Sequence, residues 1–215
     1  MKKILAFTLA ETLIVMGIIG IVSALTLPNL NSSTGEKEKV AKVKKIYQNL
    51  NDAAGRAVAV YGKMDEWAML DSSSDDKNKR RFERITEFMK LSKSNASNQT
   101  AILADGTLLE FSQMSSSDCA EDRMNYDNLQ YCGEILVDID GNNKGKNEYG
   151  IDRFYFNISA DGIIVPNDGG FNTGSKACIE SGDSMYCTRW VVENENMDYL
   201  KCNDKLKWGQ QISCK

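Results

Sequence analysis

Apolar residues are concentrated at the start of this chain, where a continuous apolar run extends from Ile4 to Leu27. Lys2 and Lys3 precede the run, and Glu11 is its only charged residue. The part from Phe7 to Leu27 has 21 residues, close to the ~20 that an α-helix needs to span the hydrocarbon core of a bilayer. The pattern therefore predicts a transmembrane helix over residues 7–27, with the two lysines on the cytoplasmic side.

The pattern changes after Pro28. Residues 29–35 are polar and small, and the residue before a proline is disfavoured in the helical conformation, so we expect a weak point at residues 28–35. Ser33 and Glu36 have the spacing of a capping box, which would restart the helix. Beyond it, residues 36–61 carry apolar side chains at helical spacing. One long helix is therefore predicted to end near Tyr61, on the order of 80 Å from its start.

The polar side of this second half carries several lysines, which we expect to face solvent. They are Lys37, Lys39, Lys42, Lys44 and Lys45. A further helix is predicted over residues 75–91, and its basic residues are also expected on a solvated face. These are Lys77, Lys79, Arg80, Arg81 and Arg84.

Strand patterns follow a polar stretch, residues 92–100, that is predicted to be a loop. Residues 101–111 and 154–165 each alternate around an Asp-Gly pair, which is typical of a β-hairpin with a tight turn. Residues 134–138 and, more weakly, 190–192 have the composition of single strands. The order of elements predicts an α+β fold, in which a long N-terminal helix packs on a small antiparallel sheet and a loop-rich C-terminal region follows.

The chain has six cysteines, all in its second half. An even number of cysteines in an exported domain favours disulfides. Fifteen pairings are possible, and we favour the sequential set because it closes three short loops. Zinc has less support, since the chain has no histidine and no Cys-x-x-Cys pair. The favoured pairs are Cys119–Cys132, Cys178–Cys187 and Cys202–Cys214.

Composition argues against several classes of function. The net charge is −4, and no basic stripe with interleaved aromatic residues is present, so nucleic-acid binding is not expected. The lack of histidine removes the commonest general base. The sequence has no Gly-rich phosphate loop and no Gly-x-Ser-x-Gly motif. We therefore do not expect an enzyme.

The N-terminal segment reads Lys-x-x-x-Ala-Phe-Thr-Leu-x-Glu followed by the apolar run. It resembles the prepilin leader of type IV pilins and type II secretion pseudopilins, although that family usually has Gly where this chain has Ala6. The resemblance implies that a prepilin peptidase removes residues 1–6 by cutting between Ala6 and Phe7, and that the new amine of Phe7 is methylated. Residues 28–215 would then form an exported pilin-like domain.

The resemblance also implies a role for Glu11. In the family, this glutamate pairs with the N-terminal amine of a neighbouring subunit, which offsets the cost of each charge in an apolar environment. The expected protein is thus a structural subunit of a type IV pilus or a type II secretion pseudopilus. Its expected partners are other subunits, an inner-membrane platform protein and an assembly ATPase. Its expected location is the cytoplasmic membrane, as a single-pass protein, before filament assembly.

Two other readings of the N-terminal segment remain open. Val22-Ser23-Ala24 has the small residues of a signal-peptidase site, so the segment could be a secretory signal. It could also be a plain membrane anchor. Either reading leads to a different function, an exported binding or adhesion domain that is not part of a filament.

Residues 138–152, which we call the aspartate loop, carry the one further constellation with chemical meaning. Asp138, Asp140 and Asn142 alternate beside Gly141, and Asp152 ends the loop. Oxygen ligands at this spacing suit Ca²⁺, and the segment is similar to a calcium-stabilised loop of some pseudopilins. The alternative is a pair of Asx/Gly turns between two strands.

The loop is not an EF-hand. An EF-hand loop would need Gly at position 143 and Glu at position 149, where this chain has Asn143 and Tyr149. A calcium site here would therefore be a looser one, formed by Asp138, Asp140, Asn142 and Asp152.

Overall fold

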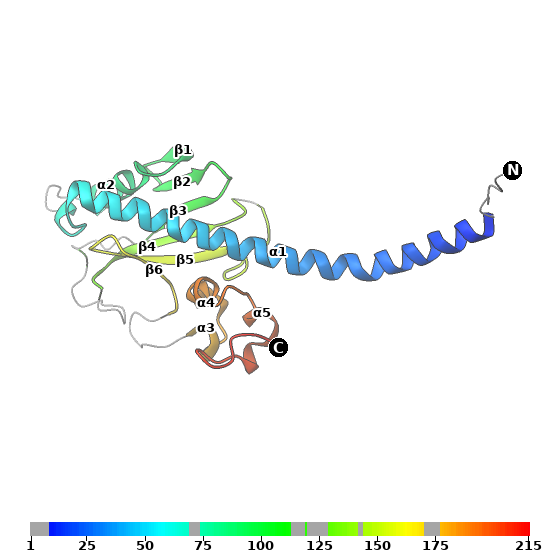
Figure 1. Ribbon diagram of the computed structural model, residues 1–215. Coiled ribbons are helices and arrows are strands. Elements are labelled where there is room, and N and C mark those ends of the chain that lie inside the picture. The colour runs from blue at the N-terminus through cyan, green and yellow to red at the C-terminus, as the bar shows by residue number, and fades with distance from the viewer. Residues whose placement is uncertain (1–8, 69–73, 113–118, 120–128, 142–143, 170–176) are drawn as a thin grey trace. The chain divides into compact units, whose positions relative to one another are not determined.

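The computed structural model of the chain describes residues 9–68, 74–112, 119, 129–141, 144–169 and 177–215, with the backbone alone at 23–34, 68, 74–78 and 112 (Figure 1). The chain forms two compact units, Met1–Glu38 and Lys39–Lys215. The predicted leader, with the processing residues Ala6 and Phe7, lies outside the described residues.

Helix α1 runs without interruption from Leu9 to Tyr61. The long helix is therefore confirmed, whereas the predicted break and the new helix start at Ser33 are wrong. Proline removes only its own N–H from the helical ladder, and a long helix can adjust around its ring. Over the residues that the structure describes, no helix is long and apolar enough to cross a membrane.

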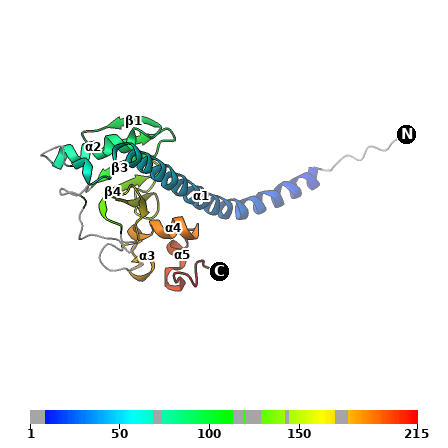
Figure 2. The same ribbon diagram turned by 60° about the vertical axis from the view of Figure 1, so that its left-hand side comes forward.

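The second unit contains a six-stranded antiparallel sheet in which each strand pairs with the next one along the chain (Figures 1 and 2). Both predicted hairpins are confirmed, around Gly106 and Gly162, which have positive φ angles of 87° and 75°. The strands are β1 (Leu91–Asn95), β2 (Thr100–Leu103), β3 (Leu108–Ser112), β4 (Tyr131–Asp138), β5 (Arg153–Ser159) and β6 (Ile164–Pro166).

Three local predictions are corrected. Helix α2 spans Ser74–Thr86 and stops short of residue 91. The predicted loop at 92–100 contains β1, an edge strand that alternation could not reveal because four of its five residues are exposed and polar. The predicted strand at 190–192 belongs to helix α4, Thr188–Asn194, where Trp190 and Val191 are buried on one helical face.

The core lies between one face of the sheet and the second half of α1. Val43, Ile46 and Leu50 of α1 are fully buried, as are Ile135 and Phe156 of the sheet. The ring of Tyr47 on the helix stacks on Phe156, with 5.9 Å between ring centroids. Every residue of this buried cluster lies at or beyond Val40. Among the described residues, the core therefore belongs to the second unit.

Helix α2 and the short 3-10 helix η1 (Glu66–Ala68) complete this unit, with Phe82 of α2 packed edge-on against Phe111. The prediction that the basic residues of α2 share a solvated face is wrong for two of them. Arg81 is fully buried, with Nη2 3.7 Å from Sγ of Cys119. Arg84 lies over the Tyr61 ring at 4.5 Å.

The C-terminal region, residues 177–215, consists of short helices that lie together in both views (Figure 2). They are α3 (Ala177–Glu180), η2 (Ser184–Tyr186), α4, α5 (Tyr199–Cys202) and η3 (Asn203–Lys205). The three predicted disulfides are confirmed, with sequence separations of 13, 9 and 12 residues. In the chain-entropy model, a closed loop of ~15 residues contributes about 3 kcal/mol.

Candidate functional site

The first candidate site is the apolar beginning of α1. Glu11 lies exposed in its first turn, where the positive end of the helix dipole favours a carboxylate. Large apolar side chains around it are exposed on every side of the helix, from 52% at Val22 to 78% at Leu9. The exposed set is Leu9, Leu13, Ile14, Val15, Met16, Ile18, Ile19, Ile21 and Val22.

A surface of this kind is unusual for a protein that stays in water alone, because contiguous apolar patches mark contact with another protein or with lipid. An amphipathic helix would leave one polar side, but between Leu13 and Val22 none of the residues is charged. The helix can therefore be covered on all sides by apolar material.

The second candidate site is the aspartate loop, which joins β4 to β5. Asp152 is fully buried, and backbone N–H groups surround its carboxylate. Its Oδ2 accepts hydrogen bonds from Lys146 (2.6 Å) and Asn147 (2.9 Å), and its Oδ1 accepts one from Glu148 (2.7 Å). The Asp152 carboxylate thus fixes the preceding turn, because hydrogen bonds to a charged acceptor are stronger than those to a neutral one.

Asp138 plays a similar part at the start of the loop. Its Oδ1 accepts from the backbone N–H groups of Asp140 (3.2 Å) and Gly141 (2.9 Å). Its Oδ2 accepts from Nε of Arg153, at 3.3 Å. Arg153 also donates to the side-chain oxygen of Asn147, at 3.1 Å, and so connects both ends of the loop.

Asp140 and Asp152 approach each other at Gly145. A Cβ atom added to Gly145 would lie 2.5 Å from Oδ2 of both aspartates, so only glycine fits between them, and its φ of +66° also favours glycine. Within the described ranges, no group of three His, Cys, Asp or Glu side chains is placed to hold a metal ion. Asn142 lies outside those ranges. The predicted calcium site therefore remains a prediction, supported by two converging carboxylate oxygens.

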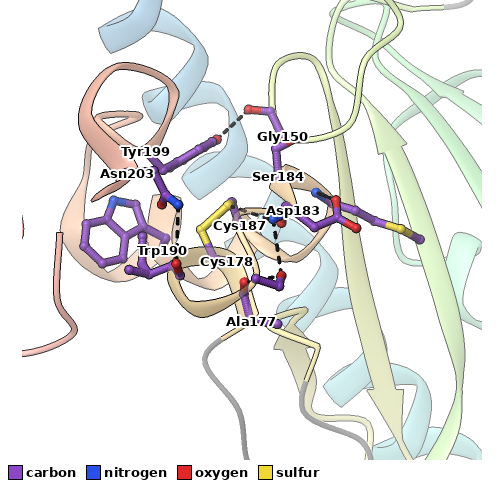
Figure 3. The surroundings of a disulfide bond; sticks show 12 residues. Gly150, Ala177, Cys178, Asp183, Ser184, Cys187, Trp190, Tyr199 and Asn203 are labelled. Atoms are coloured by element: carbon purple, nitrogen blue, oxygen red, sulfur yellow. Dashed lines mark hydrogen bonds between the residues drawn. A yellow bond between two sulfur atoms is a disulfide. The ribbon is translucent and has the colours of Figure 1, made fainter. Parts of the chain in front are cut away.

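Three successive carbonyl groups of the loop are bound by three different elements. Tyr149 O accepts from the hydroxyl of Ser184 in η2 at 2.8 Å, and Gly150 O accepts from the hydroxyl of Tyr199 in α5 at 2.5 Å (Figure 3). Ile151 O accepts from Nζ of Lys39 in α1 at 3.2 Å. The loop is consequently the junction of α1, the sheet and the C-terminal region.

The lysines of α1 were expected to face solvent, and the structure corrects this for several of them. Besides Lys39, Lys42 donates from Nζ to Ile139 O at 2.5 Å. Lys44 pairs with Glu195, just beyond α4, whereas Lys45 is exposed as predicted and lies 3.8 Å from Asp105. The ammonium groups can reach acceptors in other elements because the aliphatic part of a lysine side chain can lie along an apolar surface.

One tyrosine of the loop, Tyr149, contacts a tyrosine of β5, Tyr155. The rings of Tyr149 and Tyr155 stack with 5.4 Å between centroids, and the Tyr155 hydroxyl donates to that of Tyr149 at 3.4 Å. Burial raises the pKa of Tyr155 above its ordinary value, and the bond to Tyr149 and the charges of Glu134 and Glu110 raise it further. Tyr155 therefore stays neutral at physiological pH.

Sequence reasoning identified the aspartates of the loop but missed the groups that hold it. Nothing in the local sequence marks Lys39, Ser184 or Tyr199, which lie far from the loop along the chain. Comparison of the chain with family models, with curated proteins and with solved structures found no match. Any function is therefore inferred from the residues themselves.

Proposed function

We propose that this chain is a non-catalytic, pilin-like subunit of a type IV pilus or a type II secretion pseudopilus. It assembles through the apolar start of α1, after processing between Ala6 and Phe7 and methylation of Phe7. The observation that carries the proposal is the exposure of apolar side chains all around residues 9–22. Such a surface requires a cover, and the neighbouring helices of other subunits provide one.

The division into two units supports this proposal. The buried core and all three disulfides belong to Lys39–Lys215, and no described residue of the first unit contributes to the core. The apolar helix is therefore available for a second role. Before assembly, residues 7–27 would hold the subunit in the cytoplasmic membrane, with the folded domain on the far side.

Glu11 would set the position of one subunit against the next. After cleavage, the amine of Phe7 lies four residues before Glu11, or about one helical turn. A charge in apolar surroundings costs several kcal/mol unless it is paired, so an amine and a carboxylate from two subunits stabilise each other there. Prepilin peptidase, a platform protein and an assembly ATPase would act on the subunit in turn.

The test combines the mature N-terminus with a Glu11 variant in the native host. Mass spectrometry should find a chain that begins at N-methylated Phe7. Glu11→Ala should leave processing and folding intact and abolish incorporation into filaments. Glu38→Ala, a matched change at an exposed acidic residue of the same helix, should assemble normally. Normal filament levels in Glu11→Ala would refute the proposed role of Glu11 in positioning one subunit against the next. A mature chain that begins at Leu25 would show that the protein is secreted as a soluble domain and would refute the filament proposal.

A calcium-dependent binding domain is the second candidate, favoured by the approach of Asp140 and Asp152 at Gly145. In this function, calcium would fix the aspartate loop, and the domain would act without forming a filament. Its signature would be stabilisation by calcium together with the absence of self-association through α1.

A further inference from the structure

A groove of about 410 Å³ lies in the second unit, and the β2–β3 turn that lines it also lies against Gly141 of the aspartate loop. One wall is the flank of α1 between Lys45 and Arg56. The other wall combines the connection from α2 to β1, Phe88–Lys90, with the turn from β2 to β3, Leu103–Asp105. A volume of this size is in the range of small-ligand pockets, ~300–1,000 Å³, and fits a few residues of a peptide.

The floor of the groove is apolar. Phe88 and Met89 are half-buried, and Leu103 is buried. The guanidinium group of Arg56 lies over the Phe88 ring, 5.7 Å from its centroid. This cation–π contact restricts the long arginine side chain at the edge of the floor. An apolar side chain of a ligand can therefore be buried on Phe88 and Met89, with a cation held beside it.

The rim carries charges of both signs, with an excess of positive charge. Lys45 lies 3.8 Å from Asp105, and Arg56 lies 3.4 Å from Asp52, so each carboxylate has a cationic partner. Lys90 is exposed, and the described part of the chain offers it no ion pair. Among the described residues that line the groove, Lys90 is thus a cation without a carboxylate in ion-pair contact.

We propose that this groove binds a short peptide segment of a partner protein in which an apolar side chain stands next to a carboxylate. The apolar side chain would cover Phe88 and Met89, and the carboxylate would pair with Lys90. A basic segment would place a further cation beside Lys90 and Arg56. A phosphate, with its higher charge, would meet the carboxylates of Asp52 and Asp105. This binding does not require filament assembly.

The test uses the full chain in lipid nanodiscs, with ¹³C-labelled methionine methyl groups observed by NMR. The probe peptide is acetyl-Ala-Leu-Asp-amide, and acetyl-Ala-Leu-Lys-amide is its basic counterpart. The acidic peptide should shift the Met89 methyl signal and saturate at millimolar concentration, while the fully buried Met64 should not respond. The basic peptide should give a much smaller shift at the same concentration.

Two charge-reversal variants test whether Lys90 is responsible for binding the acidic peptide. Lys90→Glu should weaken binding of the acidic peptide roughly five-fold, since an exposed ion pair is replaced by repulsion. Lys93→Glu changes an exposed lysine of β1 outside the groove and should leave the affinity unchanged. Equal weakening in both variants, equal shifts with both peptides, or no Met89 shift with the acidic peptide would each overturn the proposal.

Discussion

The hydroxyl of Tyr199 donates a 2.5 Å hydrogen bond to the carbonyl oxygen of Gly150, and both groups are shielded from water. The bond joins the C-terminal region to the aspartate loop across 49 residues of sequence. Because it connects two segments that local patterns cannot relate, it offers a direct way to measure how strongly the C-terminal region is attached.

Tyr199→Phe should lower the free energy of unfolding by about 1–2 kcal/mol, because the buried Gly150 oxygen loses its donor. Urea denaturation monitored by tryptophan fluorescence would measure the change. Tyr186→Phe removes a hydroxyl from a half-exposed tyrosine of the same region and should cost less than about 0.5 kcal/mol. Equal stability of Tyr199→Phe and the wild type would show that the bond does not attach this region.

Asp152→Ala should lower the free energy of unfolding by about 2–5 kcal/mol, more than Tyr199→Phe, since three backbone N–H groups lose their acceptor in a buried site. The thermal unfolding midpoint, measured by circular dichroism, would report the loss. Asp204→Ala, at an exposed position of η3, is the control and should change little. A midpoint for Asp152→Ala that matches this control would contradict the assigned role of the carboxylate.

Calcium at the aspartate loop would raise the stability of the folded protein, by ~2.7 kcal/mol at a concentration one hundred times the dissociation constant. Thermal melting with excess calcium and with chelator would detect this. Asp140→Asn should remove the calcium effect, whereas Asp204→Asn should retain it. An identical midpoint in both solutions would mean that hydrogen bonds alone hold the loop.

Asp105 should make the protein less stable at acid pH. Burial raises the pKa of Asp105, but hydrogen bonding from Thr107 and the charges of Lys42 and Lys45 outweigh it and lower the pKa below 3.8, its ordinary value. A lowered folded-state pKa means that this stabilisation is fully present above pH 3.8 and is lost as the pH falls through the folded-state value.

Asp105→Asn tests whether the charge of Asp105 causes this pH dependence of stability. The variant should be less stable than the wild type at neutral pH, and the difference should shrink as the pH falls below 3.8. Urea midpoints measured across this range would show it. A difference that stays constant with pH would indicate that Asp105 acts through packing and not through its charge.

The sequence predicted those parts of the fold that depend on short-range patterns. The Asp105-Gly106 and Asp161-Gly162 turns determined both hairpins, because glycine allows the positive φ that each turn requires. The sequential disulfides were predicted because short loops are the easiest to close. The break at Pro28 was wrong because the helical segments on both sides outweigh one missing hydrogen bond.

Other parts could not be predicted because they depend on contacts between distant segments. Strand β1 is polar, and its pairing with β2 defines it as a strand. Trp190 and Val191 have high strand propensity, but they are buried in a helix, α4, which contacts β5 and β6. At the candidate site, the aspartates could be recognised from spacing, whereas the donors Lys39 and Tyr199 come from elements far away in sequence.

The disulfides also determine how the domain would respond to mechanical load. Each bridge closes a loop within one stretch of chain, with no separation greater than 13 residues, so none of them ties the C-terminal region to α1 or to the sheet. Tension on this region would instead act on its noncovalent contacts, which include the hydrogen bonds from Ser184 to Tyr149, from Tyr199 to Gly150 and from Tyr155 to Thr188. Pulling on single molecules should therefore detach the C-terminal region first, as an early rupture at low force, while the sheet remains folded.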